Sequence, residues 1–558
     1  LLATSSRDEL LKAKEQLQAA GLTEEQIQVE ASKRRRRYYP FGNETLFMIG
    51  DANTKKVYYN SVENPTGYIA ESRHLGELRG IDIRDSVVVM ESDKYRVNRF
   101  MPASNATFKR TMHDYSVMLP FLGYGIERNP VIDEHNDSRQ QRDLYLTIDA
   151  LLQKRLQDTL RQVLITDSRL GGCPNLRASV VVLDASKGDL LCSANYPLPE
   201  QDSIVMLQDM RIFRSNPAEA LGNNHAPITE RDLGLTFQSQ PGSTAKVMSA
   251  MAGLMANPEA WRYPMTVMGR ERIEGGGEPQ GDVMMSDAIK LSSNNFFINL
   301  VNLNHLYPQL ESLYSTVGAR VHPVNSTNTY TPYFFFRNER QASPLLHEMM
   351  DQVAKESYNV FDRVYMKERQ TDKTRRKDFR WNMVETGFPW GQGGLLATPM
   401  NMARVVSIVA NGGSLVPTRY VLRQGEFDMP VLESVPVLDP GAAAHLRSFM
   451  QLESDKHRAK GYGSALPLAN VSSERMGGKT GTPERYDKRS PFGKNEANDG
   501  WYICFINSAK QQAPLAIAVR LERLIDYDKR TRYLSPEAVR IVADLVIPVL
   551  NSMGYEVH

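Results

Sequence analysis

The stretch RASVVVLDASKGDLLCSANYP, residues 177–197, decides the fold class of this chain. Its two apolar runs are separated by a Lys-Gly turn, a pattern that predicts a β-hairpin. The stretches GWYICFINS (500–508) and LAIAVRLER (515–523) have the same strand-like composition. Strands on both sides of a long region with helical periodicity favour an antiparallel sheet packed with helices, which is an α+β fold.

A helix is expected directly before this hairpin. Residues 136–143 are polar and predict a linker, and LYLTIDALLQKRLQDTL (144–160) follows. Thr147 or Asp149 can serve as the N-cap of a helix, because either side chain can accept a backbone hydrogen bond. The leucines after the cap recur at helical spacing and predict one buried face.

A core helix is expected in GQGGLLATPMNMARVVSIVANGG, residues 391–413. Thr398 is a good N-cap, Pro399 suits the first helical position, and the Asn-Gly-Gly end is a helix stop. We interpret this segment as structural, with Gln392 as only a weak site candidate.

Changes in composition divide this multidomain chain into three parts. Residues 1–37 predict a helical, membrane-proximal segment with two short helices broken at Gly21. Its simplest interpretation is a solvated helical surface, and the alternative is a basic patch next to a membrane. Residues 38–140 predict an irregular, β-rich N-terminal module. Residues 141–558 form the largest domain, with a variable, charge-dense insertion around residues 320–380.

The bulk composition excludes several classes of protein. The 67 basic and 65 acidic residues leave a net charge of +2, so nothing indicates a nucleic-acid partner. No apolar run is long enough to cross a membrane. The chain begins at Leu1 rather than Met, so we expect that an anchor or export segment has been removed.

The cysteines and histidines indicate no disulfide framework and no metal site. The chain has three cysteines, and we expect Cys504 to be a buried thiol. A bridge between Cys173 and Cys192 stays open from their spacing alone. The ten histidines lack the HExxH pattern of zinc hydrolases, and no serine lies in a GxSxG elbow.

Residues 240–251, QPGSTAKVMSAM, place Ser243 after a Pro-Gly turn and Lys246 three residues later, where a helix is expected to begin. On a helix both side chains fall on one face and can meet. A hydroxyl becomes a useful nucleophile when a neutral amine takes its proton. Taken alone, the pair favours an ordinary helix start, because this spacing occurs on many helices.

Two further motifs follow in the chain. KLSSNNFFINL (290–300) contains an SxN triplet, and GGKTGTPERYD (477–487) contains KTG. The first triplet, beginning at Ser292, is favoured over the one beginning at Ser293, because Asn295 then begins the next helix. SxxK, SxN and KTG in this order are the signature of penicillin-binding proteins and class A β-lactamases.

With these motifs the chain resembles the penicillin-binding proteins, the D,D-transpeptidases that cross-link bacterial peptidoglycan. The likeness extends through residues 140–550, and it implies a transpeptidase domain with an antiparallel sheet flanked by helices and a helical subdomain. RYYPFGNETLFMIG (37–50) and HLGELRGID (74–82) resemble the non-catalytic N-terminal module of the class B type. No stretch resembles a glycosyltransferase domain.

The resemblance implies a role for each motif residue. Ser243 is the expected acylated nucleophile and Lys246 its general base. Ser292 is expected to relay a proton toward the leaving amine, and Asn294 to orient the substrate amide.

The KTG motif is expected to bind the substrate. By resemblance, Lys479 holds the substrate carboxylate together with the hydroxyls of Thr480 and Thr482. The backbone N–H groups of Ser243 and Thr482 are expected to form the oxyanion hole. Gly481 is expected to let an extended peptide approach the strand edge closely.

The implied reaction is acyl transfer from a D-Ala-D-Ala stem peptide through an ester on Ser243, with β-lactams as inhibitors and no cofactor. The implied setting is the outer, periplasmic face of the cytoplasmic membrane. Expected partners are peptidoglycan, a separate glycan polymerase and other cell-wall assembly proteins. Two alternatives remain: a D,D-carboxypeptidase or β-lactamase that passes the acyl group to water, and a non-catalytic β-lactam sensor or scaffold.

Overall fold

The structure is a computed structural model of the 558-residue chain. It describes residues 1–33, 37–50, 70, 87–92, 97–102, 143–173, 176–198, 232–235, 237–267, 281–321, 387–392, 395–425, 427–458, 468–486, 496–508 and 513–557.

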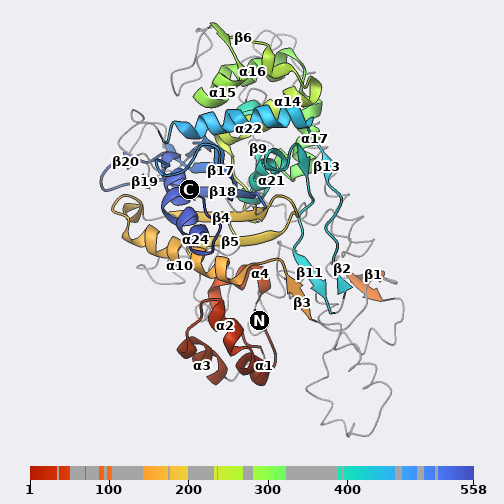
Figure 1. Ribbon diagram of the computed structural model, residues 1–558, viewed down its shortest axis with the longest axis vertical. Coiled ribbons are helices and arrows are strands. Elements are labelled where there is room, and N and C mark those ends of the chain that lie inside the picture. Colours follow the sequence, from red (N-terminus) through yellow and green to blue (C-terminus); the bar gives the residue numbers. More distant parts are fainter. Residues whose placement is uncertain are drawn as a thin grey trace.

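A five-stranded antiparallel sheet forms the centre of the molecule (Figure 1). From one edge to the other its strands are β14 (Met476–Gly481), β17 (Gly500–Ile506), β18 (Leu515–Glu522), β4 (Arg177–Asp184) and β5 (Leu190–Tyr196). The expected hairpin is therefore β4–β5, and the two late strands lie between it and the KTG strand. The KTG strand is an edge strand of the sheet.

Helices cover both faces of this sheet, which is why its central strands are apolar on both sides. On one face Val181 and Ile503 pack into a core with α21 (Pro399–Ala410). On the other face Val180 and Cys504 pack into a second core with α10 (Ala150–Thr166) and with the C-terminal helices. The C-terminal helices are α23 (Pro536–Ile541), a π-helical turn at Val542–Val546, and α24 (Ile547–Ser552). Successive side chains of a strand point to opposite faces of the sheet, so alternate residues of these strands pack into two separate cores.

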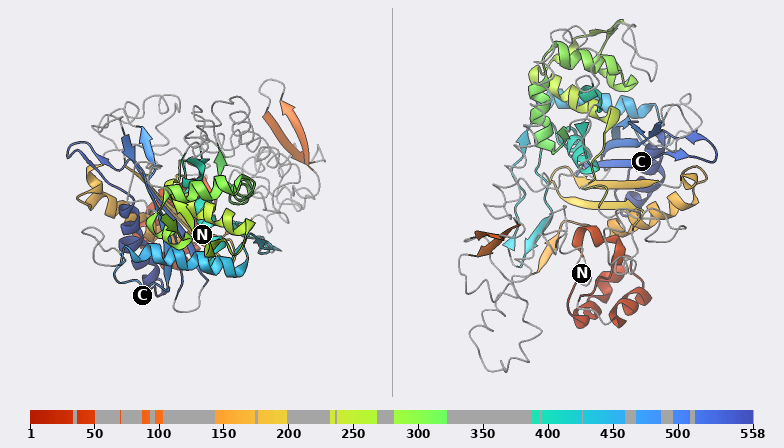
Figure 2. Two further views of the ribbon diagram at one scale, coloured as in Figure 1. Left: turned by 90° about the horizontal axis from the view of Figure 1, so that it is seen from above. Right: turned by 180° about the vertical axis from the view of Figure 1, so that it is seen from behind.

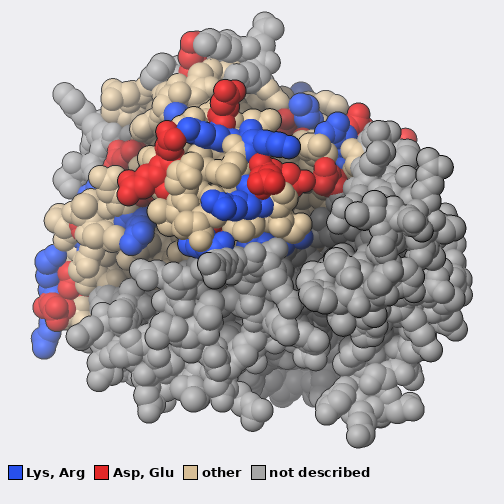
Figure 3. Space-filling view, turned by 90° about the horizontal axis from the view of Figure 1, so that it is seen from below, with Lys and Arg blue, Asp and Glu red and all other residues tan. Residues whose placement is uncertain are grey.

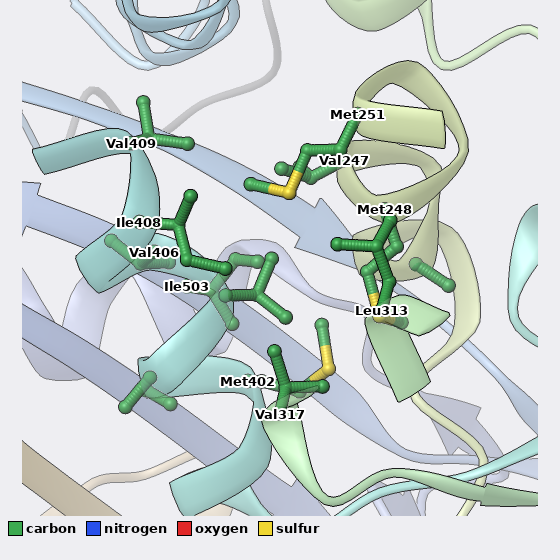
Figure 4. Packing of buried hydrophobic residues seen from close by; sticks show 14 of the residues in the cluster. Val247, Met248, Met251, Leu313, Val317, Met402, Val406, Ile408, Val409 and Ile503 are labelled. Atoms are coloured by element: carbon green, nitrogen blue, oxygen red, sulfur yellow. The ribbon is translucent and has the colours of Figure 1, made fainter. Parts of the chain in front are cut away.

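A helical subdomain lies above the sheet in Figure 1. It contains α14 (Lys246–Ala256), α15 (Met285–Leu291), α16 (Asn294–Leu303) and α17 (Tyr307–Val317), with the short strands β6 (Met265–Val267) and β7 (Gly281–Val283). The long helix α22 (Pro440–Asp455) crosses between this subdomain and the sheet. Figure 4 shows side chains of α14, α17, α21 and β17 converging, among them Val247, Met248, Met251, Leu313, Met402, Val406 and Ile503.

The N-terminal segment folds as three short helices, where two were expected. They are α1 (Arg7–Lys12), α2 (Lys14–Ala19) and α3 (Glu24–Ser32). The expected break at Gly21 is present, with φ +90°, and a second break at Ala13 divides the first helix. Helices of six residues are marginal alone, so packing of Leu10, Leu17 and Ile27 into a small core stabilises them. In Figure 2 these helices lie at the end of the molecule opposite the helical subdomain.

The described surface seen from the N-terminal end carries both signs of charge. Figure 3 shows Lys and Arg interspersed with Asp and Glu over that part of the face. On the N-terminal helices, Asp8, Lys12, Glu15 and Glu24 are exposed. The interpretation of residues 1–37 as a solvated helical surface stays a prediction, and most of the Arg run that ends the segment lies outside the described residues.

The remaining described elements are small. They are a hairpin of β1 (Val87–Ser92) and β2 (Val97–Pro102), a sheet of β3 (Leu144–Leu146), β11 (Val421–Gln424) and β12 (Phe427–Asp428), and α4 (Leu46–Ile49). Further two-stranded pairs join β8 (Arg320–Val321) to β9 (Leu395–Leu396), β10 (Ser414–Leu415) to β13 (Val435–Pro436), β15 (Glu484–Tyr486) to β16 (Glu496–Asn498), and β19 (Ile525–Asp526) to β20 (Thr531–Arg532).

The α+β fold class is confirmed, and so are several local expectations. Asp149, one of the two candidates, caps α10 by accepting hydrogen bonds from the N–H groups of Leu151 and Leu152, at 3.0 Å each. Thr398 caps α21 in a reciprocal capping box with Asn401. All three cysteines are buried free thiols, so the bridge between Cys173 and Cys192 is absent.

Other expectations fall largely or wholly outside the described residues. These are most of the module at 38–140, the linker at 136–143 except its last residue, and the insertion at 320–380 beyond its first two residues. The division into three parts accordingly stays a prediction. Among the described residues, no helix combines the length and apolar character needed to cross a membrane.

Candidate active site

Ser243 lies in a 3₁₀ turn, Gly242–Ala245, that continues directly into α14. The hydroxyl of Thr244 donates to the carbonyl of Pro241 at 2.7 Å and fixes the turn. Ser243 is partly exposed, whereas its neighbours in the turn and Lys246 are buried. A helix does begin at this motif, and the single accessible hydroxyl of the turn before the helix is that of Ser243.

Three glycines bring this turn against the KTG strand. Gly242 has φ +56°, and its N–H donates to the carbonyl of Gly391 at 2.9 Å. A Cβ on Gly391 would lie 1.9 Å from the Gly242 carbonyl oxygen, and a Cβ on Gly481 would lie 2.7 Å from that of Pro241. Gly481 is therefore required for close packing inside the protein, in addition to its expected role in letting the substrate approach.

Ser292 ends α15 in a left-handed conformation, with φ +59° and ψ +43°. This conformation is uncommon for a residue with a side chain, and it clusters at functional sites. Here it presents both polar groups of Ser292 to lysines. Lys246 Nζ donates to the Ser292 carbonyl and to its Oγ at 3.1 Å, and Lys479 Nζ donates to the same Oγ at 3.0 Å.

The neighbouring Ser293 has a different environment. Its side chain is buried, and its Oγ accepts a hydrogen bond from the N–H of Phe296 at 3.1 Å, as an N-cap does. Helix α16 begins at Asn294, one residue earlier than expected. The reason given for preferring the first triplet was therefore wrong by one residue, but Ser292 is the serine that contacts both lysines.

Lys479 is completely buried on the edge strand. Besides Ser292, its Nζ donates to the carbonyl of Thr480 at 3.1 Å and lies 3.5 Å from a carboxylate oxygen of Glu453. Burial lowers the pKa of Lys479 to about 8, against the opposing effect of Glu453. A lysine with this environment is poised to change its charge just above neutral pH.

Glu453 is the residue that the motif analysis missed. It lies near the end of α22 and is completely buried, like Lys479. Its Oε1 accepts hydrogen bonds from the backbone N–H of Thr480 at 3.1 Å and from the Thr480 hydroxyl at 2.6 Å. The signal was available, because Glu453 continues the buried stripe of Ala442, Leu446 and Met450 on this helix.

Thr482 turns its hydroxyl toward Ser535 rather than into the group around Ser292. Thr482 Oγ1 donates to Ser535 Oγ at 2.9 Å and accepts from the Ser535 N–H at 3.3 Å. Gly481 pairs with Trp501 in the sheet, and Asn294 is buried at the start of α16. The structure thus joins Lys246, Ser292 and Lys479 in one hydrogen-bonded group and places the other predicted residues on the elements around it.

No group of three or more His, Cys, Asp or Glu side chains suited to a metal ion occurs in the described part of the chain. The hydrogen-bonded group around Ser292 consists of hydroxyl and amine donors with a carboxylate behind them. This donor set is suited to proton transfer and to binding an anion.

Residues 178–532 match the family model described as "Penicillin binding protein transpeptidase domain". The match covers well over half of the chain, and the chain therefore belongs to this family. The resemblance seen in the motifs is confirmed at the level of the family. No curated protein sequence matches the chain.

Three bacterial proteins are among the solved structures that match this chain. A peptidoglycan synthetase from Bifidobacterium adolescentis shares 15% identity with a TM-score of 0.48, over 75% of this chain and 62% of its own. PBPA from Mycobacterium tuberculosis shares 18% identity with a TM-score of 0.46, over 83% of this chain and 96% of its own. Penicillin-binding protein 3 from the same organism shares 16% identity with a TM-score of 0.46, over 73% of this chain and 79% of its own. The chain thus spans less than two thirds of the Bifidobacterium protein.

Proposed function

We propose that this chain is a class B penicillin-binding protein, a peptidoglycan D,D-transpeptidase that forms its acyl-enzyme on Ser243. The observation that carries the proposal is the convergence of two buried lysines, Lys246 and Lys479, on the hydroxyl of Ser292. They converge beside a turn whose accessible hydroxyl is that of Ser243.

In the proposed acylation, neutral Lys246 takes the proton of Ser243 as its oxygen attacks the penultimate D-Ala carbonyl. The backbone N–H groups of Ser243 and Thr482 stabilise the oxyanion. Breakage of the peptide bond leaves an ester on Ser243, and the proton passes through Ser292 to the departing D-Ala amine.

In the proposed deacylation, an amine of a second stem peptide attacks the ester. The new peptide bond forms, and the proton of the amine returns to Ser243. In the acylation step that precedes this one, Asn294 orients the donor amide, while Lys479, Thr480 and Thr482 bind the terminal carboxylate that then leaves with D-Ala.

The proposed setting is outside the cytoplasm, where peptidoglycan is cross-linked. The proposed partners are D-Ala-D-Ala stem peptides, β-lactams, a separate glycan polymerase, cell-wall assembly proteins and the membrane. We keep the proposed division at residues 37 and 140, with an insertion at 320–380.

The first test is incubation with a penicillin, followed by intact-protein and peptide mass measurement. We expect one adduct, located on Ser243, and none in Ser243→Ala. An adduct elsewhere, or its survival in the folded Ser243→Ala variant, would contradict the proposal. The products formed from a stem peptide in the presence of an amine acceptor then distinguish a transpeptidase from a hydrolase. Acylation by penicillin without turnover of the peptide would support the β-lactam sensor instead.

A matched serine pair tests the proposed relay. Ser292→Ala removes the hydroxyl between the two lysines, so we expect the acylation rate to fall by about 10²–10⁴-fold, as for loss of a proton-transfer group. Ser293→Ala removes a helix cap and should mainly lower the free energy of unfolding, by about 1 kcal/mol. Stopped-flow acylation with a chromogenic cephalosporin measures the rates; a larger kinetic loss in Ser293→Ala would transfer the role to the second triplet.

A further inference from the structure

Glu453 occupies a position where a carboxylate is costly. Its side chain is fully buried on α22, on the stripe that faces the sheet. Among the described residues, Glu453 Oε2 has no hydrogen-bond partner, whereas Oε1 receives both donors of Thr480. A buried carboxylate destabilises a fold unless a cation compensates it, and Lys479 is the cation that lies 3.5 Å away.

Lys479 is held between two elements. On one side Glu453 of α22 faces its ammonium group, and on the other side Ser292, at the end of α15, accepts its hydrogen bond at 3.0 Å. Thr480 links the same carboxylate to the strand backbone, so α22 and β14 are fixed in register beside the ammonium group. The carboxylate thus acts on both the charge and the position of Lys479.

The two lysines of the site share their contact with Ser292, and Glu453 lies beside Lys479. Both amines reach the same oxygen, at 3.0 and 3.1 Å. Two ammonium groups so close to one another repel, which favours a state with one cation and one neutral amine. Glu453 forms an ion pair with Lys479, which favours the cation on that lysine.

We propose that Glu453 is a positioning residue that keeps Lys479 protonated and directed at Ser292, and thereby leaves Lys246 as the neutral amine of the pair. This inference rests on the proposed function, because it assigns the cation that binds the substrate carboxylate and the amine that acts as base. It extends the site from the motif residues to helix α22.

The charged surroundings determine the sign of the expected pH effect. Burial lowers the pKa of Lys479 to about 8, Glu453 raises it, and Lys456 lowers it. Burial alone would raise the pKa of Glu453, but Lys479, then Lys456 and His457, hold it below its usual range. The other groups in this network are Lys290 near Lys456, Arg458 near His457, and Tyr502 near Glu453. Removing the charge of Glu453 must lower the pKa of Lys479 further, so its cation is lost at lower pH.

The test is the pH dependence of acylation by a chromogenic cephalosporin, for the wild type, Glu453→Gln and Glu453→Asp. Gln keeps an oxygen for Thr480 and removes the charge; Asp keeps the charge on a shorter side chain. We expect the alkaline limb of acylation efficiency to move down by about one pH unit or more in Glu453→Gln. In Glu453→Asp we expect the limb to stay near that of the wild type, with a lower rate.

Several outcomes would overturn the inference. An alkaline limb that is unchanged in folded Glu453→Gln contradicts it, and so does an equal shift in Glu453→Asp, which would indicate packing rather than charge. If Glu453→Gln does not fold, Lys456→Gln provides the reverse test, since losing that cation must move the limb upward; a limb that stays in place counts against the charge network.

The proposed function and this inference fail in different ways. A wild-type protein that is not acylated on Ser243 at any pH overturns both, because the positioning role then has no reaction to serve. A wild type that is acylated, with pH profiles that do not respond to the charge at residue 453, overturns only the inference.

Discussion

At the scale of single residues, the site depends on side chains that are absent. Gly242, Gly391 and Gly481 lie where the nucleophile turn, the 387–392 loop and β14 meet. A methyl group at any of the three would come within 3.0 Å of a neighbouring atom. The spacing between Ser243 and the KTG strand is therefore set by backbone contact, which is stiffer than contact between side chains.

Gly391→Ala is expected to reduce both stability and acylation. Its φ of +88° disfavours any side chain, and its Cβ would lie 1.9 Å from the Gly242 carbonyl oxygen, which displaces the turn. Gly412→Ala is the matched control, because Gly412 has φ +63° but open space around it. We expect Gly412→Ala to lower the free energy of unfolding by about 1 kcal/mol and to leave acylation normal. We expect Gly391→Ala to lower the free energy of unfolding by more and to be acylated at least about tenfold more slowly.

Thermal unfolding and acylation kinetics of the two variants check this expectation. Equal behaviour of Gly391→Ala and Gly412→Ala would show that the left-handed backbone, and not the close approach to Gly242, accounts for the whole effect.

At the scale of elements, α21 shows how a buried helix is stabilised at its ends. All twelve of its residues are buried, so water cannot satisfy its first N–H groups. Thr398 Oγ1 accepts from the Asn401 N–H at 3.1 Å, and the Asn401 side chain accepts from the Thr398 N–H at 2.8 Å. Each group is satisfied by the other, which makes the cap part of the core.

Thr398→Ala is expected to lower the free energy of unfolding by about 1–2 kcal/mol, because it leaves a buried N–H without its acceptor. Thr398→Ser keeps the acceptor oxygen and should retain most of that stability. Urea denaturation followed by circular dichroism measures both, and equal losses in the two variants would refute a capping role for the hydroxyl.

The elements that sequence analysis predicted well are those specified by neighbouring residues. The β4–β5 hairpin, α10 with its Asp149 cap, and α21 each follow from local periodicity, caps and turns. The motif residues Lys246, Ser292 and Lys479 were found because the three motifs occur together in a known order.

What sequence analysis missed depends on contacts between distant segments. Glu453 and Lys479 meet only because α22 packs against β14, and no local pattern near either residue states that pairing. The left-handed backbone of Ser292 likewise follows from its place between two helices and two lysines. In the N-terminal segment, the break at Ala13 has no Gly or Pro to mark it.

At the scale of the whole molecule, the segment containing Glu44 and Met48 docks on α10 and on Tyr420 through polar contacts. Lys154 of α10 pairs with Glu44 at 3.1 Å, and Gln153 donates to the Glu44 carbonyl at 2.8 Å. The hydroxyl of Tyr420 donates to the carbonyl of Met48. In Figure 1, α4 lies between the N-terminal helices and α10.

The docking contact should depend on pH through Glu44. Burial raises the pKa of this carboxyl from 4.5 to about 7, and Lys154 only partly opposes the effect. Between pH 4.5 and 7 the folded protein therefore holds a proton that the unfolded chain has released, so this group's contribution to stability falls as pH rises through that window.

Glu44→Gln removes the buried charge while keeping a side chain of the same shape, and Lys154 retains Asp158 at 2.8 Å. We expect the free energy of unfolding of the variant to equal that of the wild type near pH 5 and to be higher near pH 8, by up to about 3 kcal/mol. Glu24→Gln is the control, since its ion pair with Lys14 is exposed and contributes little at either pH. Differential scanning calorimetry of the variant and the wild type at both pH values measures this difference. If Glu44→Gln gains no stability relative to the wild type between pH 5 and pH 8, Lys154 fully compensates the carboxylate and the docking contact is insensitive to pH.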